Sequence, residues 1–185
     1  MSPMKIYLLL FSIMFIACRN GKVKNEEYVN RIVSQWVGKE VVFPKHISAA
    51  VWDRDTVCDE LLKKTAKILV YVDSIGCTAC KLNLYDWKQK INSFSNHTDL
   101  GFLFFVNIRR NKTFTNRIKS EAFGYPIFYD PQNELEKMNR FPKDNHFQTF
   151  LLDSTNKVVL VGTPLGNPVM WNLYVREIKR LTKNN

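Results

Sequence analysis

A buried strand that leads directly into an amphipathic helix is the feature that most constrains the fold of this chain. Residues 67–73 (KILVYVD) form a compact apolar run rich in Val and Ile, which is typical of a strand covered on both faces. From position 77 to position 94 the apolar residues recur at helical spacing and share one face: Cys80, Leu84, Trp87, Ile91 and Phe94. A strand of this kind belongs in a sheet that has helices on both sides.

The rest of the chain continues this alternation. We predict, in chain order, an edge strand over 39–44, a helix within 53–64, a strand over 100–108, a helix over 111–123, a short strand over 125–130, a helix over 131–138, a hairpin of strands 147–153 and 157–162, and a helix over 168–182. This order indicates an α/β fold. We expect a central mixed sheet with helices on both faces and a C-terminal β-hairpin plus helix.

The amino-terminal residues have the pattern of an export signal. An unbroken stretch of apolar and small residues from Ile6 to Ala17 is too short to span a bilayer comfortably and suits a signal-peptide core. It ends in FIAC, which resembles the lipobox of bacterial lipoproteins and implies cleavage before Cys18 and lipidation of its sulfur. A plain signal peptide cut elsewhere and an uncleaved anchor are the alternatives. We therefore expect a lipoprotein signal peptide over 1–17, a polar tether over 18–36 and one domain over 37–185.

This export pattern predicts a location in the bacterial cell envelope, lipid-anchored and facing the periplasm. Arg19 stands where an Asp is commonly linked to inner-membrane retention, so the outer membrane is the preferred location. The chain carries 27 Lys and Arg against 17 Asp and Glu. We interpret the basic residues of the last helix as a solvated face, with attraction to anionic lipid head groups as the alternative. No nucleic-acid-binding motif accompanies the charge, so nucleic acid is not an expected partner.

Two cysteines three positions apart, Cys77 and Cys80, stand where the first buried strand meets its helix. Open α/β sheets place their chemistry at the carboxyl ends of strands. A thiol at the start of a helix is activated by free N–H groups and by the helix dipole. The second thiol lies on the same side of the first turn and can attack a mixed disulfide formed at the first. The spacing therefore provides the minimum machinery for thiol–disulfide exchange.

Around these cysteines the chain resembles the thioredoxin superfamily. The resemblance is carried by ILVYVDSIGCTACK (68–81) and FQTFLLDSTNKVVLVG (147–162) and spans about residues 37–182. More specifically, the chain is similar to membrane-anchored thioredoxin-like lipoproteins related to bacterial envelope thiol–disulfide oxidoreductases. The resemblance implies a thioredoxin-like fold, Cys77 as the attacking thiol, Cys80 as the resolving thiol, and envelope protein dithiols or disulfides as partners. We expect a monomer with no dissociable cofactor.

The chain departs from the superfamily pattern at several positions. Phe147, preceded by His146, stands where the superfamily has a cis-proline opposite the dithiol. We expect a trans bond there, because a non-proline cis bond costs about 2.5–4 kcal/mol. Gly76 replaces a frequent Trp, Tyr71 replaces a buried acid, and Asn83 replaces a frequent Glu. The superfamily's proline holds backbone that pairs with a substrate chain, so substrate binding and reduction potential are not inherited with the thiols.

His146, Phe147 and Tyr71 are the candidate residues for tuning the dithiol. If Phe147 takes the place of the proline, its ring or the neighbouring His146 should cover the two sulfurs. An apolar ring would disfavour the thiolate by desolvation, whereas a protonated histidine would favour it. In the alternative interpretation His146 points to solvent and only shapes its loop.

Other interpretations of the cysteines stay open. Zinc needs about four ligands, usually in close pairs. The remaining candidate ligands are scattered, so no metal is expected: Cys58, His46, His97 and His146. A peroxiredoxin-like thiol peroxidase is suggested by Ser74, three residues before the first cysteine of the pair, although Val70 occupies the place of that family's proline. The main alternative to an oxidoreductase is a non-catalytic adaptor lipoprotein with a structural disulfide. The simplest alternative is that both cysteines are inert core residues. Cys58 itself is interpreted as a buried small hydrophobe, or alternatively as a third thiol that traps partners.

Overall fold

The computed structural model describes residues 26–94 and 98–183. The expected lipidation site, Cys18, and one of the scattered ligands, His97, lie outside these ranges. Residues 26–36, the end of the predicted tether, are helical and fall outside the compact unit Val37–Asn185 that carries the sheet. Within the described ranges, no helix has the length and apolar character needed to cross a membrane.

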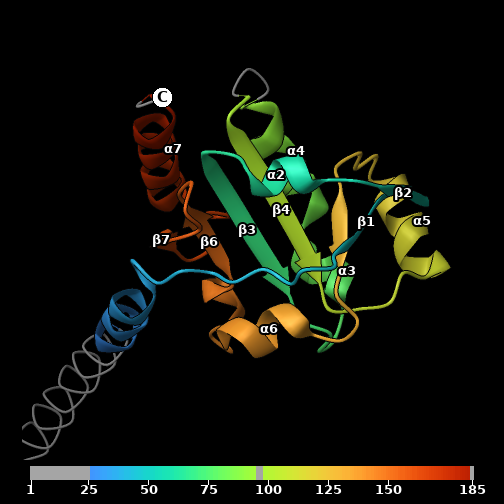
Figure 1. Ribbon diagram of the computed structural model, residues 1–185, viewed down its shortest axis with the longest axis horizontal. Helices are drawn as coiled ribbons and strands as arrows, with labels where there is room; N and C mark the ends of the chain where they lie inside the picture. The colour runs from blue at the N-terminus through green and yellow to red at the C-terminus, as the bar shows by residue number, and fades with distance from the viewer. Residues whose placement is uncertain (1–25, 95–97, 184–185) are drawn as a thin grey trace, which may run out of the picture. The chain divides into compact units, whose positions relative to one another are not determined.

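The described part of the chain contains one seven-stranded sheet in the order β2-β1-β5-β4-β3-β6-β7. Its strands are β1 (Ser48–Val51), β2 (Arg54–Thr56), β3 (Ala66–Val72), β4 (Leu100–Val106), β5 (Ile127–Tyr129), β6 (Thr149–Leu152) and β7 (Val158–Val161). β3, β4 and β5 run parallel in the middle. Antiparallel pairs flank them, β6 and β7 beside β3 and the β1–β2 hairpin beside β5. The sheet is mixed, as predicted (Figure 1).

Helices cover both faces of this sheet (Figure 1). They are α2 (Asp59–Leu62), α3 (Thr78–Leu82), α4 (Leu84–Asn92), α5 (Lys112–Ser120), α6 (Glu134–Asn139) and α7 (Pro168–Thr182), with a 3-10 turn η1 (Asn145–Phe147). On one face, residues of α3, α4, α5 and α7 share a buried cluster with alternate residues of β3 and β4. Trp87 of α4 meets the rings of Phe102 and Phe104 edge-on, with centroids 6.4 and 5.7 Å apart. α2 and α6 lie over the opposite face (Figure 1).

Local side-chain bonds explain why several elements begin where the sequence predicted. Asn167 caps α7 by accepting a hydrogen bond from the backbone N–H of Met170, and Pro168 occupies the first turn. Asn111 caps α5 in the same way. The carboxylate of Asp153 accepts hydrogen bonds from the backbone N–H groups of Thr155 and Lys157, which closes the turn between β6 and β7. The predicted hairpin and C-terminal helix are therefore confirmed.

The predicted edge strand over 39–44 is wrong. The backbone of residues 38–41 bonds to residues 156–158 at the start of β7, and one pair, Glu40 and Lys157, forms a bridge, but the segment forms no strand. The backbone of Val42 is instead held by the buried side chain of Asn139, which accepts from its N–H at 2.9 Å and donates to its C=O at 2.8 Å. The opposite edge of the sheet, beside β5, is formed by the unpredicted β1–β2 hairpin. The hairpin escaped prediction because β1 reads SAAV, with little β-branched content, and its turn contains Trp52 at a φ of 59°.

Two predicted helices also need correction. The helix within 53–64 shrinks to the four residues of α2, because Arg54–Thr56 pairs with β1 instead. The helix over 77–94 is divided at Asn83, whose φ of 45° and ψ of 58° interrupt the helical backbone between α3 and α4. Asn tolerates this left-handed conformation better than most residues, because its short polar side chain can bond locally. Here the Asn83 side chain donates to the carboxylate of Asp86 at 2.7 Å.

Candidate active site

A short turn after β3 presents the two cysteines. The Asp73 carboxylate accepts a hydrogen bond from the backbone N–H of Ile75 at 3.0 Å. Gly76 follows with a φ of 74°, a conformation that side-chain-bearing residues rarely adopt, and this accounts for glycine where Trp is frequent in the superfamily. Cys77 then occupies the N-cap of α3 and Cys80 lies in the helix. The turn therefore places the dithiol at the carboxyl end of β3, as predicted.

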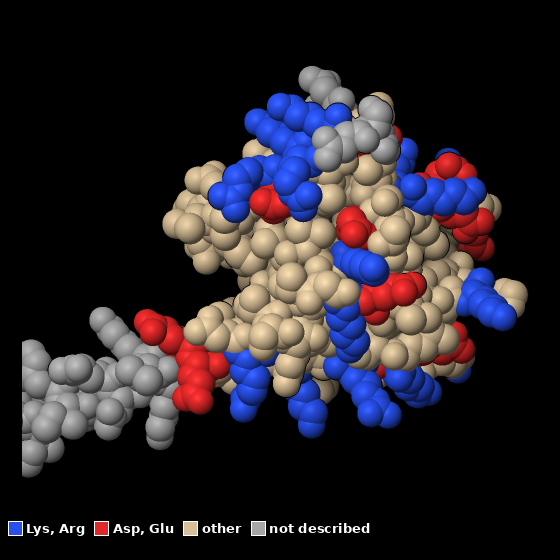
Figure 2. Space-filling model, turned by 60° about the vertical axis from the view of Figure 1, so that its left-hand side comes forward, with Lys and Arg blue, Asp and Glu red and all other residues tan. Residues whose placement is uncertain are grey.

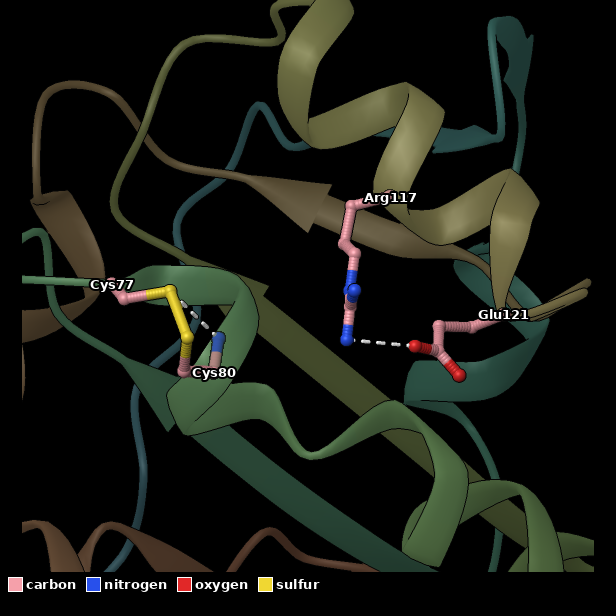
Figure 3. The surroundings of a disulfide bond; sticks show 4 residues. All are labelled: Cys77, Cys80, Arg117 and Glu121. Atoms are coloured by element: carbon pink, nitrogen blue, oxygen red, sulfur yellow. Dashed lines mark hydrogen bonds and ion pairs between the residues drawn. A yellow bond between two sulfur atoms is a disulfide. The ribbon is translucent and has the colours of Figure 1, made fainter.

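Cys77 and Cys80 form a disulfide with their Cα atoms 5.3 Å apart (Figure 3). The Sγ of Cys77 also accepts a hydrogen bond from the backbone N–H of Cys80 at 3.2 Å. Both cysteines are exposed, whereas Thr78 between them is buried. Cys80 is therefore exposed like Cys77, which the sequence did not predict.

An ion pair beside the disulfide ties the turn to α3. Lys81, directly after the second cysteine, bonds through its Nζ to the Asp73 carboxylate. Both side chains are largely shielded, with relative exposures of 25% and 18%. Because Asp73 also holds the backbone of the turn, this one carboxylate connects the residues before the dithiol to the residue after it. Sequence reasoning noted the lysine but missed its acidic partner.

A groove of about 470 Å³ lies between α3 and α5, and both cysteines line it. Arg117 of α5 borders this groove and also a smaller opening that contains Glu121. Figure 3 shows the Arg117 side chain extending from α5 into the space between the disulfide and Glu121. The guanidinium donates from Nη2 to the Glu121 carboxylate at 2.8 Å. Neither residue was a candidate from sequence, although their i,i+4 spacing on a predicted helix was a signal.

A second crevice, of about 310 Å³, opens on Cys80 and not on Cys77. It is lined by residues of β3, α3, α4, η1, β6 and the loop before α7, including Lys81, Trp87 and His146. The structure thus brings His146 to the same crevice as the second cysteine. The His146 ring is exposed, and its Nδ1 lies 2.8 Å from the Asp144 carboxylate. Covering of the sulfurs by this ring remains a prediction.

The segment that replaces the superfamily's proline contacts β3 through its backbone. Phe147 ends η1, and the described peptide bonds, including the one before it, are all trans, as expected. The next residue, Gln148, is buried and accepts a hydrogen bond at its carbonyl from the N–H of Tyr71 at 2.9 Å. Its side chain donates to the carbonyl of Pro142 at 2.9 Å. Gln148, which sequence reasoning missed, therefore joins this loop to the strand that carries the dithiol.

Tyr71 is buried on β3 with its hydroxyl donating to the side-chain oxygen of Asn133 at 2.7 Å. Its ring packs against Phe141, with centroids 5.0 Å apart. Burial raises the pKa of the Tyr71 phenol well above its ordinary value, and the carboxylates of Glu136 and Asp73 raise it further. The phenol therefore stays neutral at physiological pH, so it does not supply the charge of the acid it replaces.

Cys58 is the remaining cysteine within the ranges that the structure describes. Cys58 is a buried free thiol at the N-cap of α2, and desolvation raises its pKa. Such a thiol is a poor nucleophile, which fits the interpretation as a small buried residue. Among the residues that the structure describes, no group of three or more His, Cys, Asp or Glu side chains is placed to hold a metal ion.

Basic side chains gather over the carboxyl end of α7. Figure 2 shows Lys and Arg side chains clustered near the carboxyl end of this helix. Arg176 and Arg180 both bond to Glu177, at 3.2 and 2.6 Å, whereas Tyr174 and Ile178 of the same helix are buried. The basic residues thus form a solvated, partly neutralised face, which agrees with the simpler interpretation of this helix.

Comparison with known proteins identifies the fold. Neither a scan against protein-family models nor a search of the curated proteins finds a match. Among solved structures, the thioredoxin domain of a thiol–disulfide oxidoreductase from Bacteroides vulgatus superposes with a TM-score of 0.56 at 13% identity, over 76% of this chain and 96% of that one. The fold is thioredoxin-like.

Other thioredoxin-like structures match equally well. A protein from Bacteroides thetaiotaomicron, proposed to be a protein disulfide isomerase, gives a TM-score of 0.54 at 17% identity, over 80% of this chain and 94% of that one. Peroxiredoxin Q from Xanthomonas campestris gives 0.51 at 14% identity, over 72% and 89%. The neighbours therefore include both oxidoreductases and peroxidases, and at these identities the likeness concerns the fold.

Proposed function

We propose that this protein is a thiol–disulfide oxidoreductase of the bacterial cell envelope, with Cys77 as the attacking thiol and Cys80 as the resolving thiol. The observation that carries the proposal is the exposed Cys77–Cys80 disulfide at the junction of β3 and α3. Exposed disulfides are typically the labile or catalytic ones, whereas structural disulfides resist reduction. The thioredoxin-like fold supports the same class, with protein thiols and disulfides as substrates.

The reaction follows from the two sulfurs. In the reduced protein the Cys77 thiolate attacks one sulfur of a partner disulfide, and the other partner sulfur leaves as a thiolate. The Cys80 thiolate then attacks Cys77, which releases the partner's second thiolate and closes the disulfide seen here. Two electrons pass to the partner, and the reverse sequence oxidises a partner dithiol. The backbone N–H of Cys80, at 3.2 Å from the Cys77 sulfur, is placed to stabilise its negative charge.

Single serine variants test these roles. Reduced Cys80→Ser protein, mixed with a disulfide-bonded test protein, should accumulate a mixed disulfide on a non-reducing gel because the resolving thiol is missing. Cys77→Ser protein should accumulate far less of it. Equal trapping by both variants would contradict the assignment, a result that the exposure of both cysteines makes worth checking. The reduction potential then gives the direction of transfer, with about −270 mV typical of a reductant and about −120 mV of an oxidant.

The envelope location is tested separately. Attachment through Cys18 rests on the short apolar stretch that ends in FIAC, and we place the domain on the periplasmic side, at the outer membrane in preference to the inner. Cys18→Ala protein should move from the detergent phase to the aqueous phase in phase partitioning. Unchanged partitioning of this variant would refute the lipid anchor while leaving the chemistry of the dithiol unaffected.

A non-catalytic adaptor is the second candidate. Phe147 and a trans bond stand in place of the superfamily's cis-proline, and this observation favours it. An adaptor would keep its disulfide through repeated exposure to a reduced partner, whereas the oxidoreductase should cycle rapidly and stoichiometrically between dithiol and disulfide. Alkylation of Cys77 and Cys80 after each exposure, followed by mass spectrometry, separates the two.

A further inference from the structure

Among the described residues that line the groove between α3 and α5, one is charged, Arg117. Arg117 shares the lining with both cysteines and with small, apolar or uncharged side chains, among them Ala79, Ile108 and Phe114. The Arg117 side chain keeps 61% of its surface exposed, although it bonds to Glu121. A guanidinium has five N–H donors, so the bond from Nη2 to Glu121 leaves capacity for a second carboxylate.

We propose that Arg117 selects partners that carry an acidic residue directly beside the reactive cysteine. This inference rests on the proposed function and concerns the partner specificity of the same site. The groove would receive the partner segment next to its cysteine, with the acidic side chain at Arg117. Arg117 is then a specificity-determining residue that touches the partner and not the reacting sulfurs.

Covalent geometry brings the partner's neighbouring residue into this groove. The two Cα atoms of a disulfide usually lie about 4.4–6.8 Å apart, and the next Cα of the partner follows about 3.8 Å further on. The Cys77 sulfur, the point of attachment, belongs to a residue that lines the groove together with Arg117. Figure 3 shows the guanidinium on the α5 side of the disulfide. A residue adjacent to the bound cysteine therefore lies within reach of the arginine side chain.

The charge balance favours an acidic occupant. No Asp or Glu appears among the described residues that line the groove, and Glu121 borders only the smaller opening on the far side of Arg117. An acidic partner would meet the guanidinium without facing a carboxylate in the same groove. A basic partner would face the guanidinium of Arg117, which is exposed on the groove side although Glu121 offsets part of its charge. The discrimination should be modest and should weaken with added salt, because the contact is exposed.

Three capped tripeptides test this specificity. Each carries a central cysteine as its 2-pyridyl disulfide, and the preceding residue is Glu, Gln or Lys. Attack by reduced Cys77 forms the Cys77–peptide mixed disulfide and expels 2-thiopyridone, whose absorbance gives the rate. Cys80 then displaces the peptide thiolate and restores the intramolecular disulfide. At low salt the Glu peptide should react about threefold faster than the Gln peptide, and the Lys peptide slower by a similar factor.

Matched variants separate charge recognition from other effects. Arg117→Gln should bring the three rates together. Glu121→Gln should widen the preference for the Glu peptide, because the guanidinium loses its neutralising partner. The control is Lys119→Gln, which removes a positive charge from the same helix: Lys119 also pairs with a carboxylate, that of Asp53 at 3.0 Å, but lines neither opening beside the disulfide. This control should keep the parent's preference.

Each outcome decides between defined alternatives. If Arg117→Gln slows all three peptides equally and keeps their ratio, the arginine does not read the partner's charge and the inference is wrong. If the parent protein reacts with all three peptides at one rate, the specificity is refuted while the oxidoreductase proposal stands. If the reduced parent releases no 2-thiopyridone from any peptide, the proposed function itself fails.

Discussion

Replacing the buried lysine of the strand that leads to the dithiol should stabilise the protein. Lys67 lies in β3 with no exposed surface. Its Nζ donates to the carbonyl of Lys64 at 2.9 Å and to that of Ser154 at 3.4 Å, so its bonds are to uncharged groups. Burial lowers the pKa of Lys67 from 10.5 to about 8, and the more distant charge of Asp153 offsets only part of this. A pKa lowered to this extent corresponds to roughly 3 kcal/mol against the folded state at pH 7.

The sign of the pH dependence follows from where the proton is held. Between about pH 8 and pH 10.5 the unfolded chain keeps the proton on Lys67 while the folded protein releases it. The unfolded state then binds more protons, so the free energy of unfolding rises with pH across this window. Below about pH 8, Lys67 is protonated in both the folded and the unfolded state, so the full cost of burying its charge remains. Near pH 10 the buried tyrosines begin to act in the opposite direction, because their raised pKa values disfavour ionisation in the folded protein.

Lys67→Met removes the buried charge but leaves two carbonyl groups without their donor. Loss of these hydrogen bonds should destabilise the folded protein by about 1–2 kcal/mol. The free energy of unfolding at pH 7 should therefore increase by about 1–2 kcal/mol in total. Urea unfolding of the oxidised protein, measured from pH 7 to pH 9.5, should show a free energy of unfolding that rises less steeply with pH for the variant than for the parent. The control is Lys157→Met, which changes an exposed lysine on the neighbouring hairpin and should keep the parent's slope. A Lys67→Met protein that retains the slope would refute the reasoning.

Three further changes test other parts of the structure. Asn139→Ala removes both bonds to the backbone of Val42 and should lower the free energy of unfolding by about 2 kcal/mol in urea titration. Gly101→Ala would place a Cβ 2.8 Å from the carbonyl oxygen of Leu61, so it should destabilise by about 1–3 kcal/mol in the same assay, and an unchanged midpoint would contradict this contact. His146→Ala should slow alkylation of the reduced attacking thiol near pH 6 if the imidazolium favours the thiolate; an unchanged rate would confine His146 to shaping its loop.

Prediction from sequence succeeded where one pattern left a single interpretation. The apolar run at 67–73 has no polar alternation, so it predicted a strand buried on both faces, and β3 is buried along its whole length. The helix predicted over 168–182 matches α7, whose start is fixed by the Asn167 cap and Pro168, contacts that involve only nearby backbone. The cysteine spacing likewise placed the dithiol at the end of β3, because a strand, a turn and a helix follow one another within a few residues.

The missed features depend on partners far apart in the sequence. β1 has little intrinsic preference for a strand and is held by its pairing with β2 and β5, a pairing that no local pattern announces. The bond between Asn139 and Val42 joins residues 97 positions apart. Arg117 looked like any exposed basic residue of its helix, and only the placement of α5 against α3 brings it to the groove that the cysteines line. Local pattern therefore located the dithiol but not its surroundings.

The exposure of Cys80 affects how a bound partner would be released. In the proposed reaction the mixed disulfide at Cys77 is opened by Cys80, which acts as an intramolecular thiol with an effective concentration of at least about millimolar. If Cys80 were buried, its attack on the mixed disulfide would be the main way in which the partner is released. Here Cys80 borders the crevice beside His146 and also the groove beside α5, which Cys77 lines too. Small thiols can therefore approach the sulfur atoms of the mixed disulfide. At thiol concentrations well below the effective one, Cys80 releases the partner and closes the disulfide. Above it, an outside thiolate attacks the partner's sulfur in the mixed disulfide, which expels the Cys77 thiolate and leaves the partner joined to the outside thiol. The accessible disulfide thus makes the outcome of exchange depend on the surrounding thiol pool as well as on the partner.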